Sequence, residues 1–181
     1  MVSKKSGLDD RWVLSASTVG GLLLVALAFV PWINYEFEAD GFGRLGGLAG
    51  PSASWNVDGF QVEGVIGFGD GYIVAAAGVV IALISAIAVL GPDRPWGALM
   101  SVLIAGGVAF GVAAYDLSRD FTERLSRTGA GGNVFGSAHG HATAALPAIA
   151  CTGLAVATLG ALLLLRQRSE VSIAVSTEGH P

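Results

Sequence analysis

The sequence has few charged residues, and long stretches of it have none. Asp, Glu, Lys and Arg make up 13% of the 181 residues, whereas soluble domains carry about 25%. No charged residue occurs in the ranges 12–35, 71–92, 95–115 and 128–165. Mainly apolar runs of about 18 residues or more are long enough to cross the ~30 Å hydrocarbon core of a bilayer. The sequence therefore predicts an integral membrane protein rather than a soluble domain.

Cysteines, basic patches and catalytic motifs are also scarce or absent. Cys151 is the single cysteine, so the chain forms no intramolecular disulfide, and an apolar run around it predicts an unreactive thiol. The net charge is −4 and no basic patch occurs, which argues against nucleic acid as a partner. No P-loop, dinucleotide-binding or Ser-His-Asp pattern accompanies the glycines and serines. We expect no enzyme activity, no catalytic residue and no cofactor.

The apolar runs predict an all-α membrane protein, a bundle of four transmembrane helices with a small extracytoplasmic cap. The predicted helices cover residues 12–33, 72–90, 96–127 and 144–165, and the third continues beyond the membrane as an outer helical extension. Residues 91–95 form a short turn, so the second and third helices are an antiparallel hairpin.

Basic residues predict the orientation. Four spans place the tails, 1–11 and 166–181, on the same side as the 91–95 turn, and that side carries six Lys and Arg. The opposite side, which has the two longer loops, 34–71 and 128–143, and the outer extension of the third helix, carries four, namely Arg44, Arg119, Arg124 and Arg127. By the positive-inside rule we expect a multi-pass plasma-membrane protein with cytoplasmic N- and C-termini.

A cleaved signal peptide is an alternative for the first apolar run. Lys4 and Lys5 precede the run, and Ala26-Leu27-Ala28 resembles a signal-peptidase site. The run continues through Ile33, however, and is longer than a typical signal-peptide core. We therefore expect a retained helix.

The first loop, 34–71, is acidic, with six Asp and Glu against Arg44 alone. Asp58-Gly59 lies between alternating apolar residues, and Asp-Gly favours a two-residue hairpin turn. We expect a β-hairpin at about 55–63 in the cap. Its predicted packing residues are Trp55, Val57, Phe60 and Val62.

The predicted outer extension of the third helix carries an apolar stripe at a spacing of four residues. The stripe consists of Leu117, Phe121 and Leu125. Acid-before-base pairs at the same spacing, such as Asp120 with Arg124, support a helix here. We expect the stripe to pack against the hairpin.

His139 and His141 are weak candidates for a metal site in the second loop. Two histidines at i and i+2 can reach one ion, but zinc or copper needs three or four ligands. The third histidine, His180, lies in a tail on the opposite side. We favour exposed loop histidines and expect no metal.

Small residues four apart occur repeatedly in the predicted spans, and such pairs allow helices to approach closely. Examples are Gly107 with Gly111, Gly78 with Ala82, and Gly153 with Ala157. We expect these faces to pack the four helices together; the alternative is that one face docks onto a larger membrane protein. Aromatic residues near the span ends predict interface anchors. They are Trp12, Trp32, Tyr35 and Trp96.

The layout resembles the claudin-like tetraspan plan, although the first loop lacks that family's paired cysteines and Trp-Gly-Leu-Trp motif. The resemblance therefore implies an arrangement and no adhesion or pore function. The chain also resembles small uncharacterised four-span prokaryotic proteins that carry Pro-Trp at the end of the first helix and Gly-Asp-Gly before the second. Here these motifs are Pro31-Trp32 and Gly69-Asp70-Gly71.

These features predict a non-catalytic accessory or structural subunit that binds a larger membrane protein complex, with the bilayer and other membrane subunits as partners. The interaction candidates are Trp55, Phe60, Leu117, Phe121, Leu125, Gly107 and Gly111. The alternative is an oligomeric channel or carrier for small or apolar molecules. No ionisable group lies in the predicted spans, so polar groups for such a path would be hydroxyls such as Ser17, Ser85 and Ser101.

Overall fold

Four helices and a small sheet make up the part of the chain that this computed structural model describes. That part covers residues 6–39, 52–61, 69–91, 96–119 and 136–178. In chain order the elements are α1 (Ser6–Ala28), β1 (Pro31–Ala39), β2 (Ser52–Asp58), α2 (Asp70–Leu90), α3 (Trp96–Leu117), β3 (Gly136–Ala142) and α5 (Ala145–Glu178).

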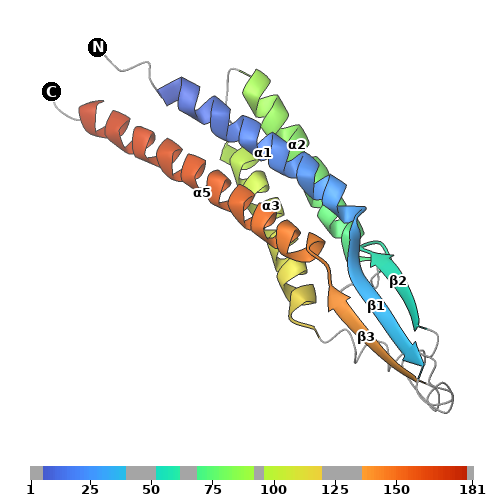
Figure 1. Cartoon of the computed structure of the whole chain (residues 1–181). Coiled ribbons are helices and arrows are strands. Elements are labelled where there is room, and N and C mark those ends of the chain that lie inside the picture. Colours follow the sequence, from blue (N-terminus) through green and yellow to red (C-terminus); the bar gives the residue numbers. More distant parts are fainter. Residues whose placement is uncertain (1–5, 40–51, 62–68, 92–95, 120–135, 179–181) are drawn as a thin grey trace.

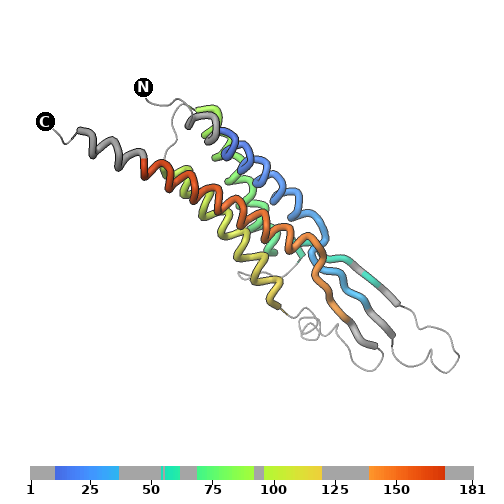
Figure 2. Tube along the Cα trace, turned by 60° about the vertical axis from the view of Figure 1, so that its left-hand side comes forward, coloured from blue at the N-terminus to red at the C-terminus, as the bar shows by residue number. Residues whose placement is uncertain are grey.

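The helices form an elongated bundle, and the strands extend from one end of it (Figure 1). We call this the sheet end. The N-terminal half of α1 and the C-terminal half of α5 extend towards the opposite end, which we call the tail end (Figure 1 and Figure 2). All four helices are long and apolar enough to cross a membrane, and many of their large apolar side chains point outward. The four predicted apolar helices are therefore confirmed.

Glycines bring the helices together in two close pairs. A Cβ atom added at Gly21 in α1 would lie 2.6 Å from the carbonyl oxygen of Gly78 in α2. A Cβ added at Gly106 in α3 would lie 2.8 Å from the backbone nitrogen of Ala157 and 2.9 Å from the carbonyl oxygen of Gly153, both in α5. Only glycine allows backbones to approach this closely. Two of the predicted small-residue faces therefore pack within the bundle.

The three strands form one antiparallel sheet in the order β2-β1-β3. In the central strand, Ile33 lies opposite Val57 of β2 and Ala142 of β3, and Tyr35 lies opposite Trp55 and Gly140. Ile33 and Tyr35 are both buried. The sheet therefore joins three segments that are far apart in the sequence.

This sheet corrects the predicted β-hairpin at 55–63. The strand β2 ends at Asp58 and pairs with β1 instead of folding back on residues 60–63. The Asp58 carboxylate accepts hydrogen bonds from the backbone nitrogens of Phe60 (3.0 Å) and Gln61 (3.1 Å). Asp58-Gly59 is thus part of a turn, as predicted, but the side chain of Asp58 takes donors that a returning strand would use. Val62 lies outside the described residues.

Several predicted helix boundaries also differ from the observed ones. The first helix ends at Ala28 rather than Ile33, because the chain becomes extended at Pro31. The last helix continues past Leu165 to Glu178, since a change to polar residues ends an apolar span but not a helix. The predicted second loop, 128–143, contains β3.

The third helix is shorter than predicted. It ends at Leu117, and Ser118 and Arg119 form a turn and a bend. The remainder of the predicted extension, residues 120–127, lies outside the described residues.

Candidate functional site

The histidines of the predicted second loop lie on β3 and face an acidic residue of β1. The register places His139 opposite Glu36 and His141 opposite Asn34. Cross-strand neighbours share a face of an antiparallel sheet, so these four residues form one polar face, on which both histidines and Glu36 are exposed. Within the described residues, however, no group of three or more His, Cys, Asp or Glu side chains is arranged to hold a metal ion.

Trp32 is a core residue of the sheet end rather than the interface anchor that the sequence predicts. Its side chain is fully buried, and its indole Nε1 donates a hydrogen bond to the carbonyl oxygen of Leu27 at 3.0 Å. A Cβ added at Gly59 would lie 2.5 Å from the Trp32 ring. The ring therefore fills the space between the end of α1 and the turn that follows β2.

Phe60, a predicted interaction residue, belongs to an aromatic cluster at the same end. Its ring centroid lies 4.8 Å from that of Phe29 and 4.6 Å from that of Tyr72. Beside it, the backbone nitrogen of Gly71 donates to the carbonyl oxygen of Gly59 at 2.7 Å. Phe60 thus joins the end of α1 to the start of α2, and it is half-buried against the core.

Two aspartates at the sheet end are fully buried, which the sequence interpretation missed. Asp70 is the first residue of α2, and Asp116 is the last but one of α3. Both aspartates interact with another group. A carboxylate at a helix N-terminus, as at Asp70, is also favoured by the helix dipole. In the sequence, Asp70 directly precedes the charge-free range 71–92 and Asp116 directly follows the charge-free range 95–115. This position at the end of an apolar helix is the signal that could have indicated their burial.

Gly107 and Gly111, predicted to pack helices, lie on an open face of α3. A Cβ added at either position would meet no atom of the described residues within 4 Å. Exposed apolar side chains surround them, including those of Ile104 and Val108. We call Gly107 and Gly111 the glycine strip. The close approach of α3 to α5 uses the adjacent Gly106 instead.

The other interaction candidates are only partly described. Leu117 is exposed at the last position of α3. Trp55 lies in β2 opposite Tyr35, but its side chain is outside the described part of the structure. Phe121 and Leu125 lie outside the described residues altogether. The predicted contact between the helical extension and the hairpin therefore stays a prediction.

The hydroxyl groups considered for a polar path mostly bond to their own helices. Ser17 donates to the carbonyl oxygen of Val13 at 3.0 Å, and Ser101 donates to that of Gly97 at 2.9 Å. Ser85 is fully buried in α2. Bonds of this kind satisfy a hydroxyl within an apolar helix without a partner helix or a solute.

Comparisons of the chain with protein-family models, curated proteins and solved structures find no match.

Proposed function

We propose that this chain is a multi-pass integral membrane protein that serves as a non-catalytic accessory or structural subunit of a larger membrane protein complex. The observation that supports this most is the glycine strip on α3. Glycine in a helix costs roughly 1 kcal/mol relative to alanine. At Gly106 this cost is offset by close contact with α5, whereas Gly107 and Gly111 meet no neighbour in the described chain. A helix of another subunit, packed against the glycine strip, would offset the cost of these two glycines.

The proposed orientation has the tail end in the cytoplasm and the sheet end outside the plasma membrane. It follows from the excess of Lys and Arg in the tails and the 91–95 turn. The four apolar helices would then lie in the bilayer, where their outward Leu, Ile and Val side chains face lipid. The sheet would form a cap above the outer surface.

The sheet offers a second contact surface for a subunit. Among the described strands, β2 and β3 each pair on one side only, so each has an open edge. Open edges can accept a strand from another chain. The exposed polar face with Glu36, His139 and His141 would lie on the same projecting element.

Purification from the native membrane in mild detergent tests the subunit proposal. We expect the wild-type chain to carry a partner in fixed stoichiometry, measured by size-exclusion chromatography and quantitative mass spectrometry. The double variant Gly107→Leu/Gly111→Leu should lose this partner, because leucine side chains would keep a second helix away from the strip. Gly97→Leu is the matched control, since Gly97 is equally open but lies about 15 Å from Gly107 along α3.

Two outcomes would contradict the proposal. If the wild-type chain purifies as a stable, solitary monomer, it is not a subunit of a larger complex. A partner that stays bound to the double variant as firmly as to Gly97→Leu does not use the strip. A stoichiometric partner that proves to be a second copy of this chain would instead support the oligomeric alternative.

A further inference from the structure

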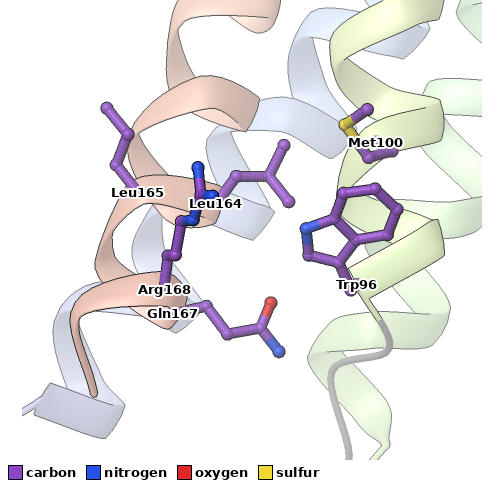
Figure 3. A pocket seen from close by; sticks show the side chains of 6 residues that line it. All are labelled: Trp96, Met100, Leu164, Leu165, Gln167 and Arg168. Atoms are coloured by element: carbon purple, nitrogen blue, oxygen red, sulfur yellow. The ribbon is translucent and has the colours of Figure 1, made fainter. Parts of the chain in front are cut away.

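A cavity of about 550 Å³ lies between α3 and α5 at the tail end (Figure 3). Its lining residues are Trp96, Met100, Leu164, Leu165, Gln167 and Arg168. Trp96 and Met100 come from the first turns of α3, and the other four come from one stretch of α5. The leucines precede Gln167 and Arg168 by about one turn, so the wall changes along α5 from apolar to polar towards the tail end.

The polar part of this wall lies where the apolar spans end. Trp96 is the first residue of the candidate span in α3, and Arg168 is the last but one of the candidate span in α5. Both side chains are exposed. Leu99 and Leu163, each next to a lining residue in the sequence, are buried and belong to a small apolar cluster that joins the helices at this end. In a membrane, these positions correspond to the level of the lipid headgroups.

The charged and apolar side chains of the lining indicate which class of ligand fits the cavity. Among the residues that the structure describes, the lining contains one cation, Arg168, and no acidic side chain, and its four other members besides Gln167 are apolar or aromatic. A small soluble anion would leave the apolar wall in contact with water. An uncharged lipid would leave the guanidinium without an anionic partner. An amphiphile with an anionic headgroup matches both parts of the wall.

We propose that this cavity binds one anionic phospholipid. The guanidinium of Arg168 donates hydrogen bonds to the headgroup phosphate, for which its planar donors are well suited. An acyl chain lies along Met100 and Leu164, and the Trp96 ring covers it at the level of the headgroup. This inference rests on the membrane insertion contained in the proposed function, but it does not depend on a partner subunit.

Lipid competition on the purified full chain tests the proposal. The protein is equilibrated in mild detergent with equal amounts of phosphatidylglycerol and phosphatidylcholine, and the lipid retained after washing is measured by native mass spectrometry. We expect the wild type to retain phosphatidylglycerol preferentially. Arg168→Gln should lower the phosphatidylglycerol-to-phosphatidylcholine ratio about fivefold, the effect of one basic residue near an anionic headgroup. Arg168→Lys should keep most of the preference.

A matched control separates a site from general attraction of charge. Arg166→Gln removes the same charge from the same end of α5, but Arg166 does not line the cavity. We expect this variant to keep the wild-type ratio. Met100→Trp, which fills the cavity, should lower the retention of both lipids. Equal effects of Arg166→Gln and Arg168→Gln, or no lipid preference in the wild type, would overturn the proposal.

A displacement experiment distinguishes a bound lipid from a bound soluble phosphate compound. Millimolar glycerol 1-phosphate should leave the bound phosphatidylglycerol in place, because it lacks an acyl chain; its displacement of the lipid would overturn the assignment. Alkaline carbonate extraction of native membranes tests insertion itself, and release of the chain would contradict both proposals. A solitary wild-type chain that keeps its lipid preference contradicts only the subunit proposal.

Discussion

Tryptophans at the two ends of the bundle occupy opposite environments. At the sheet end, Trp32 is 0% exposed and its indole nitrogen is hydrogen-bonded. At the tail end, Trp12 is 70% exposed and Trp96 is 59% exposed. The sequence places all three near the ends of apolar runs and predicts the same anchoring role for each. The difference shows that the tryptophan of the sheet end is part of the core, whereas both tryptophans of the tail end lie on the surface.

Contacts between distant segments explain the packed sheet end. The backbone nitrogen of Thr143 donates to the carbonyl oxygen of Trp32 at 2.8 Å, which ties the start of α5 to β1. At the tail end, the buried cluster is small and a cavity lies between parts of α3 and α5. We infer that substitutions at the sheet end affect the whole fold, and that comparable ones at the tail end affect mainly local surfaces.

The largest expected effect comes from Trp32→Ala. Removal of a fully buried tryptophan leaves a cavity and typically costs about 3–5 kcal/mol. The free energy of unfolding, measured by denaturant titration in detergent micelles, should fall by that amount. Trp96→Ala is the tail-end control and should change it by less than about 1 kcal/mol, since a surface side chain is removed. Similar losses in both variants would break the contrast between the two ends.

A smaller effect is expected from a single methyl group at Gly59. Its Cβ would lie 2.5 Å from the Trp32 ring, which is held by the hydrogen bond to Leu27 and cannot easily yield. Overpacking of this kind costs about 1–3 kcal/mol. Gly97→Ala is the control, because a Cβ there meets nothing within 4 Å and alanine favours the helix. We expect Gly59→Ala to lower the midpoint of thermal unfolding and Gly97→Ala to leave it unchanged or raise it.

The helices could be predicted from the sequence because their signal is local. Long charge-free runs identify four spans, whatever their neighbours are. The end of the first helix was harder to predict, since Phe29, Val30 and Ile33 are apolar and fit a helix or a strand equally well. The alternation of Ile33, Tyr35 and Phe37 with polar residues was the available signal for β1.

The contacts of the sheet end could not be predicted, because they depend on pairing between distant segments. Nothing in the Gly- and Ala-rich segment of β3 predicts a strand, and its register with β1 is what places His139 opposite Glu36. Similarly, Gly106 and Gly107 are adjacent in the sequence but lie about 100° apart around α3. Their different roles follow from the position of α5, and that position cannot be deduced from the local sequence of α3.

The smallest predicted effect concerns the threonine that joins the sheet to α5. The Thr143 hydroxyl donates to the carbonyl oxygen of Pro31 and accepts a hydrogen bond from the backbone nitrogen of Ala145 at 3.2 Å. Thr143→Ala should therefore cost about 1 kcal/mol, and Thr143→Ser should restore most of it. Ser101→Ala at the tail end removes only a bond to the serine's own helix and should be near neutral. If both alanine variants unfold at the same denaturant concentration, hydrogen bonds between segments do not distinguish the two ends, and only the buried aromatic residues do.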